Sequence, residues 1–471
     1  MTKDEELEQL RQENSALREQ VAVLSQRIQE LEALLAKDSH NSHLPPSSDR
    51  FHRQQRSLRN RSEKKVGGQP GHPGSTLEWS ETPDLVIVYP VECCQHCGRD
   101  LREVESLQVE RRQVLDLPPQ RRLVIEHQAQ QKCCPGCHEI SAAPFPDDVR
   151  APVQYGAAFG AVGVYLVQQQ LLPYERACEV MQDLLGSTMS VSTLQALVER
   201  CAEQLEPVEQ QIKAALSQAE VLHQDETGLY VAGQRHWLHV SATEQLTHYA
   251  VHSKRGKAAL EAIGILQDFA GVSVHDGWQS YWQFACGHAL CNVHHLRELT
   301  YLAEEQQQAW ASEMKEVLLD IKTAVEQVRA LGQQHLHPLE VADWKARYRA
   351  LLVEGYLANP PDPPPKTGKK GRHKQSAARN LLDRLSKHQE AVLLFLDNFA
   401  VPFDNSLAER DLRMVKVQQK VSGCFRSWVG AHAFCRIRGY LSTLRKQGMA
   451  VLTALEQTLL GHPVSPTFSS S

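Results

Sequence analysis

Apolar residues recur with a seven-residue period at the N-terminus of the chain. Two offset series occupy the positions that face the partner helix in a coiled coil. The first series is Leu7, Asn14, Val21, Ile28 and Leu35, and the second is Leu10, Leu17, Leu24 and Leu31. Branched residues in the first series with Leu in the second favour a parallel two-helix coiled coil, in which Asn14 fixes the register. Residues 1–37 are therefore predicted to dimerise; the alternative is a single amphipathic helix packed on its own domain.

A different pattern begins near residue 220. Three strand-like segments, VLHQDETGLYV, RHWLHVSAT and LTHYAVHS, are separated by short polar turns. KAALEAIGIL then predicts a helix, and GVSVHDGWQSYW predicts a fourth strand with its exit. The order β-β-β-α-β is that of an RNase H-like core. A mostly helical insertion is expected to follow, with an exposed, disordered break from Pro360 to Lys374.

Two apolar helical stretches precede this core. The first covers about 153–170, and the second, 174–185, ends at a glycine. Ser190 or Ser192 can cap a third helix. This order resembles a DNA-binding helix-turn-helix, although an ordinary helical hairpin gives the same pattern. The candidate DNA-facing residues are Ser192 and Thr193.

Charge is distributed unevenly along the 471 residues, although the net charge is only −5. Residues 49–66 contain seven Lys or Arg and two acids, residues 366–374 contain five and no acid, and residues 405–446 contain nine and two acids. Local basic stretches in a mildly acidic chain are typical of a protein that grips a polyanion at chosen places. The first stretch lies in a turn-rich linker, which is either a basic arm on phosphates or a solvated tether.

Neither a signal peptide nor a membrane span is expected. The charged N-terminus has no apolar core region, and the longest apolar run, about 156–167, is shorter than the roughly 20 residues that cross a bilayer. We therefore expect a cytoplasmic protein without a membrane partner. Its twelve cysteines then indicate metal binding or buried thiols rather than disulfides.

Four of these cysteines form two C-x-x-C pairs separated by 36 residues. The pairs are Cys94 with Cys97 and Cys134 with Cys137. Two such turns close a tetrahedral, structural zinc site, so this spacing predicts a zinc ribbon. Cys93 and Cys133 lie next to the pairs and can replace Cys94 and Cys134 as ligands.

Three acids suggest a catalytic centre. Asp225 lies on the first predicted strand, Asp276 ends the fourth, and Glu409 lies on a predicted helix. Three carboxylates suit two Mg²⁺ ions, which cleave and transfer phosphodiesters. Structural alternatives exist: a strand-end turn at Asp225, a hairpin turn at Asp276-Gly277, and a capping box from Ser406 to Glu409. Basic residues of the same helix, expected to meet phosphates, are Arg410, Arg413, Lys416 and Lys420.

The sequence resembles the insertion sequence 66 family of bacterial transposases along nearly the whole chain. The shared motifs are the zipper, PPSSD at 45–49, GGQPGHPG at 67–74, DET at 225–227, HDGW at 275–278, DNSLAER at 404–410 and KVSGCFRSWVGA. The resemblance implies that Asp225, Asp276 and Glu409 match the family's DDE positions. The family commonly has Asn-Asn where this chain has Asn405-Ser406.

The resemblance also marks Cys291 and His294 as the Cys-x-x-His signature that follows the second Asp in many DDE transposases. From the residues alone, a wider group can form a second metal site or simply steady the core. That group is Cys286, His288, Cys291, His294 and His295.

The expected function is that of a DNA transposase. It would bind the terminal inverted repeats of its element as a homodimer or higher oligomer, cleave them with Mg²⁺ or Mn²⁺, and join them to target DNA. Structural Zn²⁺ and accessory proteins of the same element complete the expected partners, and the bacterial nucleoid is the expected location. The alternatives are an inactive DNA-binding repressor and a magnesium nuclease that does not join strands.

The predicted fold is an α+β multidomain chain. Its segments are a coiled coil at 1–37, a flexible basic linker at 38–80, a zinc ribbon at 81–148, a helix-turn-helix region at 150–215, an RNase H-like core at 216–430 with a helical insertion at 296–390, and a C-terminal helical tail at 431–471.

Overall fold

The computed structural model describes residues 79–116, 123–361 and 375–468, with isolated residues between 14 and 32. Those isolated residues are all helical, as the heptad pattern predicts. Four of their apolar side chains are 55–61% exposed in the single chain: Leu17, Val21, Leu24 and Ile28. Self-association through them stays a prediction. The predicted linker up to residue 78 and the segment 362–374 lie outside the described residues.

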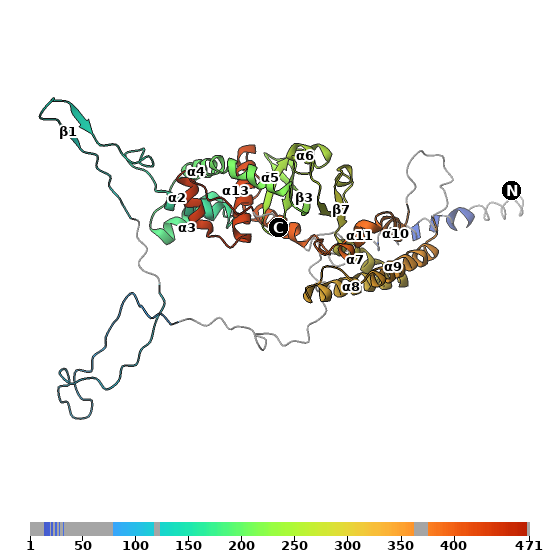
Figure 1. The fold of residues 1–471 in the computed structure, drawn as a ribbon, viewed down its shortest axis with the longest axis horizontal. Helices are drawn as coiled ribbons and strands as arrows, with labels where there is room; N and C mark the ends of the chain where they lie inside the picture. The colour runs from blue at the N-terminus through green and yellow to red at the C-terminus, as the bar shows by residue number, and fades with distance from the viewer. Residues whose placement is uncertain are drawn as a thin grey trace, which may run out of the picture.

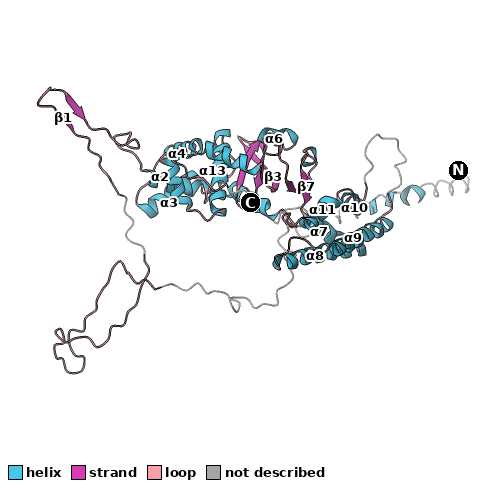
Figure 2. Ribbon diagram, in the orientation of Figure 1, coloured by secondary structure: helices cyan, strands magenta, loops and turns pink. Residues whose placement is uncertain are grey.

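A five-stranded mixed sheet lies at the centre of the packed body (Figures 1 and 2). Its strands are β3 (Val221–Val231), β4 (Gln234–Ala242), β5 (Thr247–His252), β6 (Val272–His275) and β7 (Gly287–Leu290). Their order is β5-β4-β3-β6-β7. β3 pairs antiparallel with β4 and parallel with β6, and β6 pairs parallel with β7. The longest strand, β3, is therefore central in the sheet.

The first four strands and helix α6 (Lys257–Ile263) confirm the predicted β-β-β-α-β order. β3 and β4 are joined by two residues, Ala232 and Gly233, which both have positive φ angles, 50° and 78°. Such a two-residue turn matches the right-handed twist of the paired strands. β7 was not among the predicted strands.

Helices cover the sheet. α12 (Ser406–Ser422) packs on β3 and β4, whereas α5 (Glu206–Leu216) and α13 (Trp428–Lys446) pack on β5. Gly439 lets α13 approach closely, because an added Cβ would lie only 3.1 Å from the backbone oxygen of Thr247. Since α13 contributes buried residues to the sheet core, the chain from residue 431 onward belongs to the same packed body as the sheet.

The three helices expected before the core are present as α2 (Ala157–Gln168), α3 (Tyr174–Leu185) and α4 (Val191–Gln204). α3 ends at Gly186, which adopts the left-handed conformation common at helix C-termini. Ser190, rather than Ser192, caps α4. α2 and α4 also pack against α14 (Val451–Leu459), so these helices share a core with the C-terminal part of the chain.

The segment expected to be a helical insertion packs in an apolar cluster that also includes Val274 of β6 and Ala289 and Leu290 of β7. Its helices are α7 (Asn292–Glu304), α8 (Ala309–Ala330), α9 (Pro338–Ala358), α10 (Ala377–Lys387) and α11 (Gln389–Asp397). α11 packs on β7, and α7 packs on α8, which connects this helical layer to the sheet edge (Figure 1).

The segment expected to be a zinc ribbon contains little regular structure in its described part. It has one short antiparallel hairpin, β1 (Gln131–Cys133) with β2 (Ile140–Ala142). In Figure 1, the hairpin lies at the end of an arm that leaves the packed helices at α2, and the segment 79–116 lies apart from it. Among the described helices, none combines the length and apolar character needed to cross a bilayer.

Candidate active site

Asp225 and Asp276 occupy matching positions just beyond the parallel pairing of β3 and β6: Asp225 lies within β3, and Asp276 directly follows β6. β3 and β6 pair in parallel, and the last pair of the register is His223 with Val274. Asp225 and Asp276 each follow two residues later. Because side chains alternate between the faces of a sheet, residues at matched positions of parallel strands lie on the same face. The two acids are therefore presented together at one edge.

The same register extends to β7. His275 pairs with Leu290, so Cys291 follows β7 at the position that matches Asp276. Cys291 is also the residue that precedes α7, and its backbone oxygen accepts a hydrogen bond from the backbone nitrogen of His294. Cys291 and His294 thus lie one helical turn apart, beside the second acid.

Glu409 reaches this edge from α12. Its Oε1 lies 3.2 Å from Nε2 of His294 and 4.0 Å from Sγ of Cys291. The capping-box alternative is wrong, because Asn405 rather than Ser406 is the residue at the helix boundary. The backbone nitrogen of Ser406 donates to the Asp404 carboxylate instead, at 2.9 Å. The Glu409 carboxylate is therefore used for a tertiary contact.

Asn405 attaches the start of α12 to the strand that carries Asp225. Its Nδ2 donates to the backbone oxygen of Gln224 at 2.7 Å, and its Oδ1 lies 2.9 Å from Nδ1 of His223. Its backbone nitrogen donates to Sγ of Cys291 at 3.2 Å. Asn405 is only 2% exposed. One buried residue thus holds the Glu409 helix against β3 through its side chain and against Cys291, after β7, through its backbone.

The negative charges of the other two acids both act on Asp225. Burial, followed by the negative charges of Glu226 and Asp276, holds the pKa of Asp225 well above its usual range, and Glu409 adds to the effect. A hydrogen bond from the backbone nitrogen of Glu226, 2.8 Å long, opposes this shift. Like charges in a buried site are costly unless a cation or a proton neutralises them.

The donor set fits divalent cations in type. All three acids offer oxygen, the donor that Mg²⁺ and Mn²⁺ prefer. Their oxygens are spread more widely than a single-ion site requires. Among the described residues, the only group of three whose ligand atoms all lie within 4.8 Å is Cys291, His294 and Glu409. Burial by itself would raise the pKa of Glu409, but the hydrogen bond and charge of His294 lower it.

The other members of the wider cysteine and histidine group do not join this cluster. Nδ1 of His288 lies 3.1 Å from Nε2 of His275, and Nδ1 of His295 lies 3.1 Å from Oδ1 of Asn292. Cys286 packs with the apolar residues beneath the sheet. Of the two interpretations from the sequence, a second metal site or residues that steady the core, the second describes these residues.

Glu226 was missed by the sequence reasoning. Its side chain is 2% exposed, accepts a hydrogen bond from the Tyr281 hydroxyl, and pairs with Arg255 at 2.7 Å. The Arg255 guanidinium lies 3.7 Å from the ring centre of Trp278 and 4.8 Å from that of Trp237. The adjacent acids of the DET motif were the available signal. The cation that pairs with Glu226 lies 29 residues away and was not marked by any local pattern.

The basic residues of α12 that are expected to meet phosphates are exposed: Arg410, Arg413, Lys416 and Lys420. Lys416 also donates to the backbone oxygen of Gly228 at 3.0 Å, and burial lowers its pKa. The hydroxyls of Ser192 and Thr193 each lie 2.8 Å from the Ser190 hydroxyl. These two candidate DNA contacts therefore have partners within the α4 cap.

The two cysteine pairs form nearly identical turns. In the first, the nitrogen of Cys94 donates to the oxygen of Arg99, and the nitrogen of Gly98 donates to the oxygen of Cys94. The second repeats this pattern from Cys134 to Glu139 and from His138 to Cys134. Backbone amides of residues 96 and 97 lower the pKa of the Cys94 thiol, and those of residues 137 and 136 do the same for Cys134. These turns therefore favour Cys94 over Cys93, and Cys134 over Cys133, as the candidate zinc ligand at the start of each pair.

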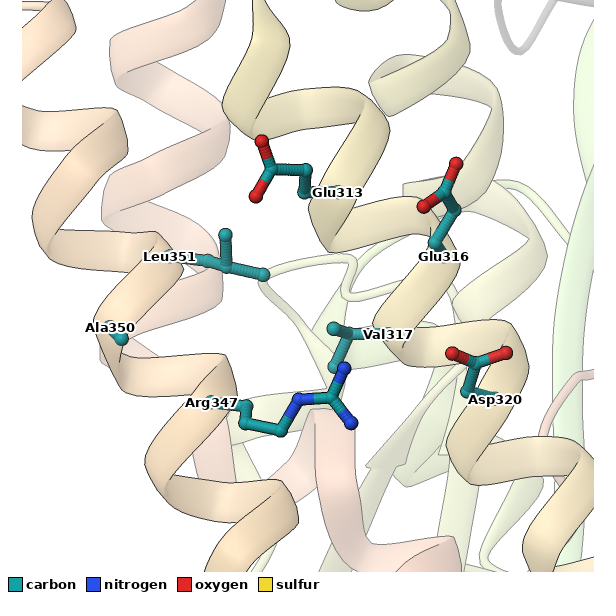
Figure 3. A pocket seen from close by; sticks show the side chains of 7 residues that line it. All are labelled: Glu313, Glu316, Val317, Asp320, Arg347, Ala350 and Leu351. Carbon is teal, nitrogen blue, oxygen red and sulfur yellow. The ribbon is translucent and has the colours of Figure 1, made fainter.

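One cavity in the helical layer lies away from the acids. It has a volume of about 280 Å³ and lies between α8 and α9 (Figure 3). Figure 3 shows Glu313, Glu316 and Asp320 on α8, facing Arg347 on α9. This acidic groove belongs to the helical layer and contains none of the predicted site residues.

Comparison with known proteins gives two matching family models. The model of the transposase IS66 family matches residues 152–433, and that of a family of unknown function (DUF6444) matches residues 2–78. None of the curated proteins matches the chain. The first match covers more than half of the chain and includes the sheet, the helical layer and the Glu409 helix. The chain therefore belongs to the IS66 family of transposases.

Proposed function

We propose that this chain cleaves and joins DNA strands at an RNase H-like active site formed by Asp225, Asp276 and Glu409. The support is the placement of these acids: two occupy matching positions beyond the parallel pairing of β3 and β6, and the third is on α12. Burial and the charge of Glu226 raise the pKa of Asp225, and the charges of Asp276 and Glu409 add to this rise. Acids collected from such distant segments are expected where cations must be bound.

The three carboxylates would hold two Mg²⁺ or Mn²⁺ ions, which supply an activated oxygen nucleophile and relieve charge on the leaving oxygen. The protein's own part is to orient the ligands. Asn405 holds the Glu409 helix against β3, and Glu226 with Arg255 packs beside the two aspartates. The exposed cations of α12 then line the approach of the phosphate backbone.

The remaining assignments follow the chain. We propose that residues 1–37 dimerise the protein, that Cys94, Cys97, Cys134 and Cys137 bind structural zinc, and that α3 and α4 contact the element ends. The support is the exposed apolar row at the N-terminus, the two matching cysteine turns, and the capped helix α4. Accessory proteins of the same element are further candidate partners.

A strand-cleavage assay on DNA that carries the element ends tests the proposal. Asp225→Asn, Asp276→Asn and Glu409→Gln should each reduce Mg²⁺-dependent cleavage by about 10³-fold or more while end binding persists. Asp268→Asn, at an exposed acid outside the site, is the matched control and should retain activity. Binding without cleavage by the unaltered protein would favour the repressor alternative. Cleavage without joined products would favour the nuclease.

A further inference from the structure

Cys291, His294 and Glu409 form a donor set that two magnesium ions do not explain. Sulfur and imidazole nitrogen are poor ligands for Mg²⁺, but with a carboxylate oxygen they form a typical zinc donor set. Cys291 and His294 have the C-x-x-H spacing, and Glu409 joins them from a helix 118 residues further along the chain. Among the described residues, no other three candidate ligands lie this close together.

The distances suit a tetrahedral ion. Zinc bonds of about 2.0–2.3 Å at tetrahedral angles place pairs of ligand atoms about 3.3–3.6 Å apart. His294 Nε2 and Glu409 Oε1 are 3.2 Å apart, and Cys291 Sγ and Glu409 Oε1 are 4.0 Å apart. All three ligand atoms lie within 4.8 Å of one another, so side-chain movements of about an ångström or less complete three of the four positions, and the fourth is left for water.

The surroundings of the sulfur support this assignment. Cys291 is 1% exposed, and the backbone nitrogen of Asn405 donates to its Sγ at 3.2 Å. Amide hydrogen bonds of this kind orient and stabilise a metal-bound thiolate. His294 and Glu409 are more open, with side chains 19% and 30% exposed, so an ion can enter from their side. The charge of Arg297 also acts on Glu409, so affinity should be lower than at a closed four-ligand site.

We propose that Cys291, His294 and Glu409 bind Zn²⁺ as an inhibitory site that withdraws Glu409 from the catalytic cations. Binding forms bonds from zinc to sulfur, nitrogen and oxygen and releases the thiol proton to solvent, with no change of oxidation state. Glu409 cannot serve both sites with the same oxygen. The inhibitory consequence rests on the proposed function, whereas the binding itself does not.

Binding is tested first, with the full-length protein dialysed so that only tightly held zinc remains. Co²⁺ is added as a spectroscopic probe, because a thiolate-to-cobalt charge-transfer band reports sulfur ligation. The unaltered protein should bind one more equivalent with this band than Cys291→Ser or His294→Gln. The matched control is Cys201→Ser, a buried cysteine in α4 outside the cluster, and it should match the unaltered protein. Equal bands in all four proteins overturn the proposal.

His294→Gln is the decisive variant should Cys291→Ser fold poorly, because the His294 side chain is partly exposed. Inhibition is tested next, with Zn²⁺ titrated into the cleavage assay at saturating Mg²⁺. The zinc concentration for half-inhibition should rise by about 10- to 100-fold in His294→Gln. An unchanged inhibition curve overturns the regulatory role. A protein that never cleaves DNA, but binds the extra ion, contradicts the proposed function and leaves the zinc site standing.

Discussion

Two groups of candidate metal ligands in this protein are built in different ways. The carboxylate site is assembled by long-range packing: Asp225 and Glu409 are 184 residues apart and meet through the sheet, α12 and the Asn405 contacts. The cysteine turns are built locally, each by backbone hydrogen bonds within six residues. In Figure 1 these turns lie in separate arms rather than in one packed core.

The difference shows what each group needs from the rest of the chain. The acids are positioned before any ion arrives, because buried strands and a buried asparagine hold them. Each cysteine turn positions only its own pair, so a shared ion would have to supply the connection between the turns. We therefore expect metal ions to bind at the acids after the site has folded. At the cysteines we expect metal binding to be required for the segment to fold.

The largest expected effect is at the cysteine turns. Cys94→Ser should abolish structural zinc binding, because a structural zinc ion contributes on the order of 10 kcal/mol to the folding of its module. Residues 79–150 should then become sensitive to proteases, while the melting temperature of the sheet domain stays the same. Zinc content and limited proteolysis measure the two effects.

Cys93→Ser is the matched control, since Cys93 adjoins the turn without receiving its amide hydrogen bonds. It should retain zinc and resist proteases. Loss of zinc in Cys93→Ser with retention in Cys94→Ser would reverse the ligand assignment. A fall in the sheet domain's melting temperature on zinc removal would contradict the contrast between the two sites.

The next effect is at the acids. Asn405→Ala removes both side-chain hydrogen bonds that hold α12 to β3. A small displacement of Glu409 should lower the cleavage rate by about 10²-fold and raise the Mg²⁺ concentration for half-maximal activity. Affinity for the element ends should be unchanged. Rates measured over a Mg²⁺ titration separate this positioning role from simple loss of stability.

Asn380→Ala, at an exposed asparagine of α10, is the control and should leave both quantities unchanged. Thermal unfolding of each variant accounts for the orphaned partners of Asn405, which should cost about 1–3 kcal/mol each. An Asn405→Ala protein with normal Mg²⁺ dependence and a normal rate would show that the α12 position does not depend on this contact.

The sequence predicted the parts of the fold that are determined by local residue patterns. The segment VLHQDETGLYV coincides with β3, and the glycine at 186 and the serine at 190 mark helix ends where the structure has them. The four-residue strand β7 was too short for any periodic signal, although it places Cys291 beside Asp276. Asn405 and the pairing of Glu226 with Arg255 depend on contacts between distant segments, which no local pattern specifies.

The resemblance to a family identified the three acids as a set. The strand register explains physically why two of them lie close together. Matching positions beyond the parallel pairing of β3 and β6 bring Asp225 and Asp276 together. From the spacing in the chain alone, a strand-end turn and a hairpin turn were equally consistent with these aspartates. Tertiary packing therefore decides which acids can share cations, and it likewise removes the capping-box role of Glu409.

The smallest expected effect is at the Ser190 cap, which is a local sequence signal within the packed helices. Ser190 caps α4 by accepting a hydrogen bond from the backbone nitrogen of Thr193 at 3.1 Å. Ser190→Ala should lower the free energy of unfolding by about 1 kcal/mol, because packing of the helix persists without its cap. Ser192→Ala, which removes a hydroxyl that contacts only the cap, should cost less, and denaturant unfolding measures both. Should Ser190→Ala instead unfold the helices around α4, local signals would matter as much in the packed body as in the cysteine turns.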